Sequence, residues 1–311
     1  MIEQTGKEEI EITKEQVIPP KEPKGLAIWL TIPLFFLTMI IILGLVSDIL
    51  DLIYSLLAEE TYKETTLFKV VEQWVMFFSV WLSAWLVMKY MDQQPTQEIG
   101  MSIHGRGKDI LYGLLMAIVL YVIGFGVLLA TGNIVIEGIN PSLSTLATSF
   151  VFFLPAAMIE EVMTRGYILN RLMSKMNKFL ALVLSSVLFS VMHAGNPNLG
   201  TLPYINLFLA GVMLGASYIY TRNLWFPISL HVFWNWIQGP VLGFEVSGTN
   251  MFSPLLTISR PEENILNGGL FGFEGSILCS IISLAAATFI TLWCIKQKKQ
   301  ETIRTAEHQS S

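Results

Sequence analysis

Two adjacent glutamates and an arginine follow a stretch of sequence that would suit the interior of a lipid bilayer. The apolar run SFVFFLPAA (149–157) leads into MIEEVMTR (158–165), which carries Glu160, Glu161 and Arg165. A charged side chain at the centre of a bilayer costs about 3 kcal/mol or more. Each of these three charges therefore needs a partner or a function.

The spacing of the three charges separates the two glutamates. Residues four apart lie on one face of a helix, so Glu161 can pair with Arg165, and Glu before a base is the favourable order. Glu160 points about 100° away and cannot share that arginine equally well. An unpartnered carboxylate in low dielectric suits proton transfer. The alternative is that all three charges cap the helix at the interface, where Arg171 and Lys175 follow.

Two other apolar segments also carry polar side chains. His193 ends one segment, and His231 and Asn235 lie four residues apart in the other, so they share a helical face. A lone histidine at the end of a span is commonly interfacial, and an Asn–His face can be a hydrogen-bonding patch between helices. The alternative is that these side chains form an active site together with Glu160.

The combined set of side chains can support hydrolysis if the segments converge inside a bundle. One carboxylate, two imidazoles and one carboxamide supply a general base, a proton shuttle and oxyanion donors. Glu160, His193 and His231 are equally a ligand set compatible with zinc. No span has a serine beside a Gly-flanked elbow or a pair of aspartates, so serine and aspartate types of intramembrane hydrolysis have no residues here.

The elements that must position these residues are membrane-spanning helices. Of the 311 residues, 53% are hydrophobic and 14% are charged, against about 25% charged residues in soluble domains. The apolar residues come in blocks of about 20, the length that crosses ~30 Å of hydrocarbon. We therefore predict an all-α polytopic membrane protein, a bundle of about eight transmembrane helices with an intramembrane catalytic cavity. The predicted spans are 26–48, 67–89, 109–131, 145–165, 179–195, 204–220, 224–240 and 276–295.

The positions of Lys and Arg predict the orientation of the helices. If the N-terminus is cytoplasmic and the spans alternate, the outer side receives only Lys63, Lys69 and Arg260. The cytoplasmic side receives 16 such residues: Lys7, Lys14, Lys21, Lys24, Lys89, Arg106, Lys108, Arg165, Arg171, Lys175, Lys178, Arg222, Lys296, Lys298, Lys299 and Arg304. Cytoplasmic loops are enriched in Lys and Arg, so both termini are predicted to be cytoplasmic.

The chain is predicted to consist of one membrane domain, 25–295, between cytoplasmic tails at 1–24, which is expected to be disordered, and at 296–311. The Gly-containing segment 241–275 is expected to be an irregular, re-entrant loop on the outer side. The net charge of −5 and the lack of a basic face argue against a nucleic-acid partner. The expected partners are the lipid bilayer and a membrane-associated peptide or protein substrate.

The two cysteines, Cys279 and Cys294, both fall in the last apolar block, and neither lies near another cysteine or a histidine in sequence. We interpret them as small core hydrophobes rather than as ligands.

Three motifs follow one another in successive apolar segments. EEVMTR (160–165) fits EExxxR, FSVMH (189–193) fits FxxxH, and HVFWN (231–235) fits HxxxN. In this order the sequence resembles the CPBP family of CAAX prenyl proteases and bacteriocin-processing (Abi) proteins, in its bacterial branch, over 145–240. Thr164 departs from the aromatic or apolar residue that often precedes the motif arginine.

This resemblance implies an intramembrane endopeptidase of the cell membrane that cuts a membrane-associated protein or peptide. By motif position, Glu160 would activate a water molecule with the assistance of His193. His231 and Asn235 would stabilise the tetrahedral oxyanion.

The resemblance also implies a supporting role for Glu161 and Arg165, which would hold Glu160 in place. Proteins of this family are often labelled metalloproteases, so Zn²⁺ is possible as a cofactor. A water activated by glutamate without a metal explains the same residues, and Asn235 would be a poor zinc ligand, so the metal-free mechanism is preferred.

Depth along the helices gives a geometric prediction. At ~1.5 Å per residue, Glu160 lies toward the cytoplasmic end of its span, whereas His193 lies ~22 Å beyond Lys178 toward the outer side. The two can meet only if the fourth helix continues to about Ser174 or if spans are tilted, and we predict the long helix. A separation above ~10 Å would remove the geometric basis for joint catalysis.

Two other functions are compatible with the sequence. One is a non-catalytic immunity or binding protein on the same scaffold, in which Glu160 would be dispensable. The other is a transporter with Glu160 as a proton-coupled site, which would need alternating access and a repeat architecture. No internal repeat is visible in the sequence.

Overall fold

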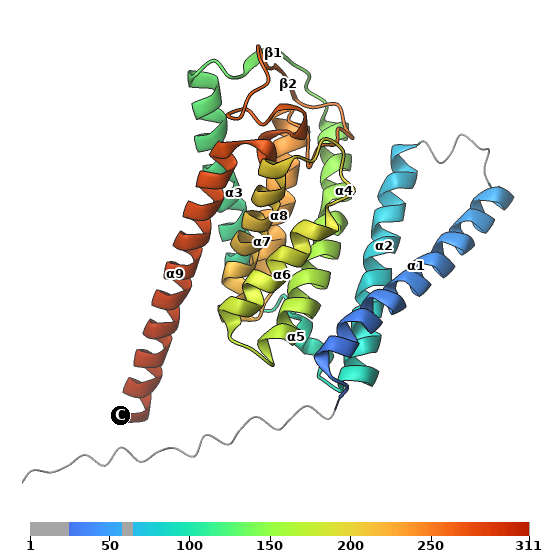
Figure 1. Cartoon of the computed structure of the whole chain (residues 1–311), viewed down its shortest axis with the longest axis vertical. Helices are drawn as coiled ribbons and strands as arrows, with labels where there is room; N and C mark the ends of the chain where they lie inside the picture. The colour runs from blue at the N-terminus through green and yellow to red at the C-terminus, as the bar shows by residue number, and fades with distance from the viewer. Residues whose placement is uncertain (1–24, 58–64, 311) are drawn as a thin grey trace, which may run out of the picture.

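The computed structural model describes residues 25–57 and 65–310, so the predicted tail at 1–24 lies outside the described residues. The chain folds into a bundle of helices with a small sheet at one end (Figure 1). The α-helices are α1 Ile28–Leu57, α2 Thr66–Leu86, α3 Gly107–Ala130, α4 Leu143–Glu161, α5 Asn170–Met173, α6 Lys178–Met192, α7 Thr201–Thr221, α8 Trp225–Trp236 and α9 Ile277–Ser310.

Three of these helices continue as wider, π-helical turns. The π-helical segments are Val87–Asp92 after α2, Val162–Leu169 between α4 and α5, and Ile237–Val241 after α8. π-helical turns inside helices occur frequently at functional sites. The second of them begins directly after Glu161, so it overlaps the second part of the EExxxR motif at 160–165.

All eight segments predicted as spans are helical in the structure. Six helical segments of the described chain are long and apolar enough to cross a membrane: Ile28–Leu56, Thr66–Asp92, Gly107–Ala130, Leu143–Met173, Thr201–Thr221 and Ile277–Thr305. The helices α6 and α8 are shorter, with 15 and 12 residues. The predicted class, an all-α polytopic membrane protein, is confirmed, and the count of eight crossings stays a prediction.

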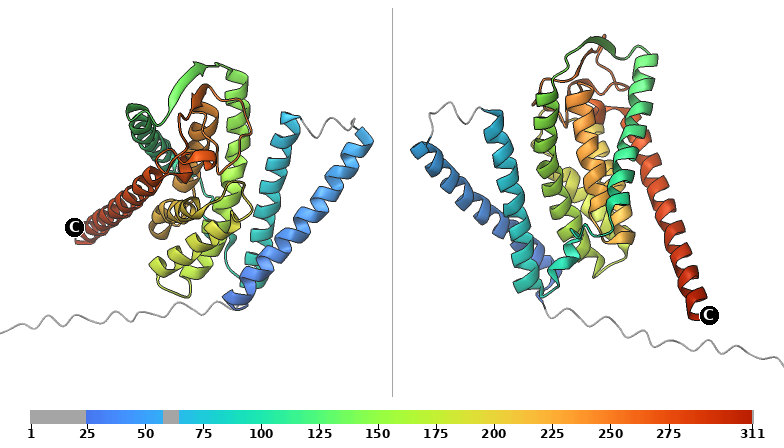
Figure 2. Two further views of the ribbon diagram at one scale, coloured as in Figure 1. Left: turned by 45° about the horizontal axis from the view of Figure 1, so that its top comes forward. Right: turned by 180° about the vertical axis from the view of Figure 1, so that it is seen from behind.

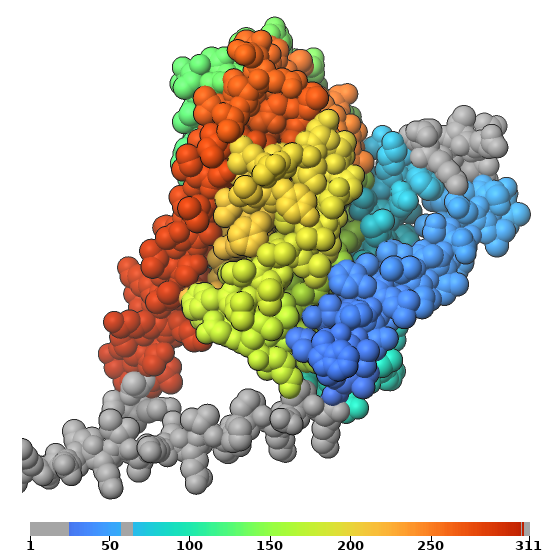
Figure 3. Space-filling model, in the orientation of Figure 1, coloured from blue at the N-terminus to red at the C-terminus, as the bar shows by residue number. Residues whose placement is uncertain are grey.

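The surface of the bundle agrees with a bilayer environment. Large apolar side chains such as Ile40 on α1, Val122 on α3 and Leu292 on α9 are exposed along their helices. In water these rows would form apolar patches larger than soluble monomers present. Figure 3 shows α9 along one flank of the molecule and α1 along the other.

The interior is formed by two main groups of packed side chains. One group joins the first helices to α4 and α6, with Phe35, Phe77 and Leu182 among its members. The other joins α3, α7, α8 and α9, and includes Tyr121 and Phe273. Figure 2 shows from behind how α8 lies between α3 and α4. Because α8 contacts both, it places its polar residues in the middle of the bundle.

The fourth helix is long, as predicted. From α4 through the π-helical turn to α5 it runs over Leu143–Met173, 31 residues. Its far end is held by a buried ion pair, in which Arg171 Nη2 lies 2.9 Å from Asp92 Oδ1 at the end of α2. The last helix, α9, continues through the residues predicted as a C-terminal tail as far as Ser310.

A small antiparallel sheet closes one end of the bundle. It pairs β1 (Val135–Ile139) with β2 (Leu256–Ser259). The segment predicted as an irregular loop therefore contains a strand, besides the 3₁₀ turns Gly269–Phe271 and Phe273–Gly275. We call this the sheet end, and the opposite end, where α1 begins and α9 finishes, the terminal end (Figure 1).

Candidate active site

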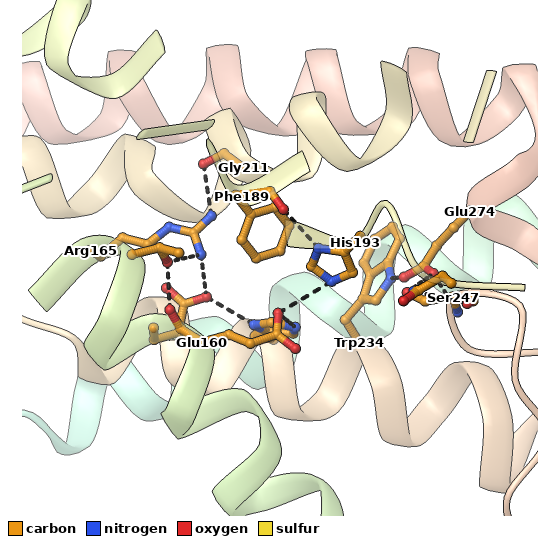
Figure 4. Close-up of polar contacts among 12 residues, drawn as sticks. Glu160, Arg165, Phe189, His193, Gly211, Trp234, Ser247 and Glu274 are labelled. Atoms are coloured by element: carbon orange, nitrogen blue, oxygen red, sulfur yellow. Dashed lines mark hydrogen bonds and ion pairs between the residues drawn. The ribbon is translucent and has the colours of Figure 1, made fainter. Parts of the chain in front are cut away.

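The three predicted acid–base residues meet inside the bundle. Glu160 Oε2 on α4 lies 3.6 Å from Nε2 of His193, which follows α6, and 3.8 Å from Nε2 of His231 on α8. Figure 4 shows Glu160 and His193 facing each other across the site. The geometric condition set by the sequence, a separation below ~10 Å, is therefore met.

Glu160 borders a small internal cavity. Its Oε2 atom is buried and accepts no hydrogen bond from any residue that the structure describes. The cavity measures about 40 Å³, and a site needs only ~10–15 Å³ to hold one water. The lining residues are Glu160, Phe189, His193, Leu207, Ala210, Met213, Leu214, His231, Trp234, Asn235, Ser247 and Glu274. The carboxylate thus presents a free acceptor to a space that is large enough for water.

The neighbouring glutamate has a different environment. Glu161 Oε1 accepts from Arg165 Nη1 at 2.8 Å, as the sequence predicted, and lies 2.9 Å from His231 Nδ1. Glu161 is fully buried, whereas the side chain of Glu160 is 28% exposed. The two acids are therefore separated, as predicted: Glu161 is engaged by two cationic or donor groups, and Glu160 faces the cavity.

Arg165 is held by more partners than the sequence indicated. Its Nη1 also donates to Thr164 Oγ1 at 2.8 Å, and its Nη2 donates to the carbonyl of Gly211 at 3.0 Å. The guanidinium carbon lies 4.5 Å from the centre of the Phe189 ring. Thr164 Oγ1 in turn donates to the carbonyl of Glu160. Thr164, which departs from the family pattern, thus connects the buried arginine to the backbone of the candidate base.

His193 is oriented by the last turn of α6. Its Nδ1 lies 2.8 Å from the carbonyl oxygen of Phe189, and the two rings pack with centroids 4.7 Å apart. A carbonyl can only accept, so Nδ1 carries a proton and Nε2 is directed at Glu160. The carbonyl oxygen and the ring of Phe189 therefore position the imidazole of His193 within the FxxxH motif.

His231 and Asn235 lie one turn apart on α8, on the face that borders the cavity. His231 directs Nδ1 at Glu161 Oε1. An ionised carboxylate accepts but does not donate, so Nδ1 carries a proton and Nε2 donates only from the imidazolium form. Asn235 is buried and lines the cavity, and its amide supplies donors that do not depend on protonation.

Sequence reasoning missed Glu274. This carboxylate belongs to the turn Phe273–Gly275 and lines the same cavity. Oε1 accepts from Trp234 Nε1 at 2.9 Å, and Oε2 accepts from the backbone N–H and the hydroxyl of Ser247, both at 2.8 Å (Figure 4). It ties the loop of the sheet end to α8, beside Asn235. No local signal distinguishes it from the other glutamates of that loop.

Two glycines of α7 were also missed. The carbonyl of Gly211 accepts from Arg165, and a Cβ atom at this position would lie 2.8 Å from Cβ of Ser186 on α6. At Gly215 a Cβ atom would lie 2.4 Å from Leu182 Cδ1. The signal for this close approach was present, because GVMLG (211–215) has the small-xxx-small spacing of packed membrane helices.

The two cysteines play no part in the site. Cys279 and Cys294 are free and buried, which confirms their interpretation as small core side chains.

The residue types at this site suit zinc, but their arrangement does not. Two imidazoles with a fixed Nδ1 and one carboxylate are a typical zinc ligand set. Within the described residues, however, no three His, Cys, Asp or Glu side chains come together in a way that could hold a metal ion. The metal-free mechanism stays the prediction, with Zn²⁺ as the alternative that chelation can test.

Fold and site together define a multi-pass membrane protein with a glutamate–histidine site inside its helical bundle. The family model of type II CAAX prenyl endopeptidase Rce1-like proteins matches residues 142–237, the region that carries all three motifs. Residues 142–237 are therefore similar to the Rce1-like domain of the CPBP family, which confirms the resemblance over that region, and this similarity points to a peptidase in general terms. No curated protein matches the chain.

Proposed function

We propose that the protein is an intramembrane endopeptidase that hydrolyses a peptide bond in a membrane-associated protein or peptide by means of a water molecule activated by Glu160. One observation carries the proposal. The buried Oε2 atom of Glu160 has no hydrogen-bond partner among the described residues and faces Nε2 of both His193 and His231 across a cavity that has room for water.

Glu160 would act as the general base. It takes a proton from water as the water oxygen forms a bond with the carbonyl carbon of the substrate. The tetrahedral intermediate then collapses, the carbon–nitrogen bond breaks, and the same proton passes from Glu160 to the leaving nitrogen. His193, whose Nε2 lies 3.6 Å from the carboxylate, would orient the water as an acceptor. A positioned base of this kind contributes roughly 10²–10⁴-fold to the rate.

Asn235 and His231 would stabilise the developing oxyanion. Both lie on the cavity face of α8. Asn235 can donate through its amide in any protonation state, whereas His231 can donate through Nε2 only as the imidazolium. The contact between Glu161 Oε1 and His231 Nδ1 fixes the orientation of the ring so that Nε2 faces the cavity. Removal of one oxyanion donor typically lowers kcat about 10²–10³-fold.

Glu161 and Arg165 would position the reacting groups without contacting the substrate. The pair is buried, and Glu161 Oε1 contacts both Arg165 and His231. Since Glu161 and Glu160 are adjacent on the backbone, the ion pair fixes the turn from which Glu160 projects.

The proposed location is the cell membrane, with both termini in the cytoplasm. The apolar helices support a multi-pass membrane protein, and the distribution of Lys and Arg supports the orientation.

The test is cleavage of a quenched library of membrane-proximal peptides by the detergent-purified full chain. We expect wild-type protein to cleave, Glu160→Ala and His231→Ala to be inactive, and wild-type activity to survive a zinc chelator. Loss of activity on chelation that zinc restores would reassign Glu160, His193 and His231 as metal ligands. Cleavage unchanged in both variants would contradict the proposal and favour a non-catalytic binding protein on the same scaffold.

A further inference from the structure

The cavity is bounded differently toward the two ends of the molecule. Toward the terminal end, the residues that follow Glu160 on its helix form a packed layer. Glu161, Thr164, Arg165 and Tyr167 are all buried to 1% exposure or less. Their polar atoms are tied to neighbouring helices, as in the bonds from Arg165 to Gly211 on α7 and from Tyr167 to the carbonyl of Thr31 on α1. This layer closes the site on that side.

Toward the sheet end, the cavity is bordered by loops. His193 follows the last residue of α6 and is succeeded at once by the exposed residues Ala194 and Gly195. Ser247 and Glu274, which belong to the segment that carries β2, line the same cavity. In Figure 4 these two residues lie on the far side of His193 from Arg165. Access to Glu160 is therefore from the sheet end.

The two ends also differ in charge. Among the connections that the structure describes in full, the three at the sheet end, residues 131–142, 194–200 and 242–276, contain a single Lys or Arg, Arg260. That arginine is paired with Glu245. The connections at the terminal end include Arg106, Lys175 and Arg222. By the rule that positive loops stay in the cytoplasm, the sheet end is the outer end.

We infer that the candidate active site opens to the outer face of the membrane, so that its substrate is a peptide segment exposed outside the cytoplasm, such as an exported peptide or the outer portion of a membrane-anchored one. The nature of the substrate in this inference rests on the proposed function. The direction of opening depends only on the packed layer, the loops and the distribution of charge.

Single cysteines can test the direction of opening. Both native cysteines are buried, so the wild-type chain is the unlabelled control. Ala194→Cys reports the mouth next to His193, Ala210→Cys reports the cavity that this residue lines, and Lys175→Cys reports the exposed turn at the terminal end. Each full-length variant is treated with a small membrane-impermeant thiol reagent in intact cells and in inside-out vesicles.

We expect Ala194→Cys and Ala210→Cys to be labelled in intact cells to the extent seen after permeabilisation. Lys175→Cys should be labelled only after permeabilisation or in inside-out vesicles. Labelling of Ala210→Cys that requires inside-out vesicles, or its absence in intact cells, would overturn the inference, as would labelling of Lys175→Cys in intact cells that exclude a cytosolic control.

The labelling result does not depend on catalysis. The same three cysteines are therefore placed in a Glu160→Gln background, where we expect the same labelling pattern without peptide cleavage. Failure of the cleavage assay with the expected labelling would remove the proposed function and keep the direction of opening. Peptide cleavage together with the reversed labelling pattern would keep the proposed function and overturn the direction of opening.

Discussion

Glu160 and Glu161 are neighbours in sequence and both contact His231, but through different ring nitrogens and with different other partners. Each acid has one buried oxygen without a hydrogen-bond partner among the described residues. Glu161 uses its other oxygen to bind Arg165 and His231, whereas Glu160 lines the cavity. A helix turns its successive side chains by about 100°, and that rotation places Glu161 against Arg165 and His231 Nδ1, and Glu160 toward the cavity and the Nε2 atoms of the two histidines. We therefore expect substitutions at the two positions to affect different properties.

Removal of the Glu161 carboxylate should destabilise the protein. In Glu161→Ala, Arg165 would stay buried without its charged partner, and breaking a buried ion pair in this way costs about 3–5 kcal/mol. We expect a marked fall in the unfolding temperature in detergent. Glu160→Gln, which leaves the buried pair of Glu161 and Arg165 intact, is the matched control and should unfold near the wild-type temperature. Equal unfolding temperatures for all three proteins would contradict the assigned role of Glu161.

Much of this site could be predicted from residues alone, because helical spacing determines which side chains share a face. The spacing of Glu161 and Arg165 predicted their ion pair, and the spacing of His231 and Asn235 predicted their common face. The contact between Glu161 and His231 could not be predicted, since it joins two helices whose relative rotation depends on the packing of the whole bundle.

At the scale of elements, α6 and α7 approach closely because Gly211 and Gly215 leave no side chain between them. At Gly211 a Cβ atom would also meet the backbone, with Ser186 Cα at 2.9 Å, whereas at Gly215 the nearest atom is the flexible tip of Leu182. We expect Gly211→Ala to lower the unfolding temperature and peptide cleavage more than Gly215→Ala. Gly44→Ala, with nothing within 4 Å of the new Cβ, is the neutral control. A Gly211→Ala protein that matches Gly44→Ala in both measurements would contradict this packing.

The loop of the sheet end depends on Glu274. Glu274→Ala would leave the donors of Trp234 and Ser247 unpaired in a buried place, and each such group costs about 1–3 kcal/mol. We expect the variant to lose stability and to cleave more slowly, because Trp234 adjoins Asn235 on α8. Glu263→Ala, an exposed residue of the same loop, should behave as wild type in thermal unfolding and in cleavage. Equal unfolding temperatures and equal cleavage rates for the two variants would contradict the role of Glu274 in positioning the loop.

The elements that were missed share a physical cause. The strands β1 and β2 are short and pair across a long stretch of chain, so neither has a partner within its own neighbourhood. The π-helical turn after Glu161 likewise depends on packing, because residues 162–169 are all buried. The local sequence pattern predicted the helices and their polar faces. Contacts between segments that are distant in sequence determined the strands and the π-helical turn.

In the whole molecule, the predicted orientation requires that the short helices α6 and α8 cross the membrane together with the six longer ones. If α6 crosses, the turn at 174–177 and the loop at 194–200 lie on opposite sides of the membrane. We expect a protease site inserted after Lys175 to be cut from one side only, and one inserted after Asn198 from the other side only. Cleavage of both sites from the same side would reduce the number of crossings and remove the proposed position of His193.

The rate of peptide cleavage by Glu160→Gln tests directly whether Glu160 is the general base. This substitution keeps the size of the side chain and removes its ability to accept a proton from water. We predict a loss of about 10²–10⁴-fold in kcat, with the unfolding temperature unchanged, and full activity in the exposed control Glu263→Gln. A Glu160→Gln protein that folds normally and cleaves at the wild-type rate would contradict the assignment of Glu160 as the base.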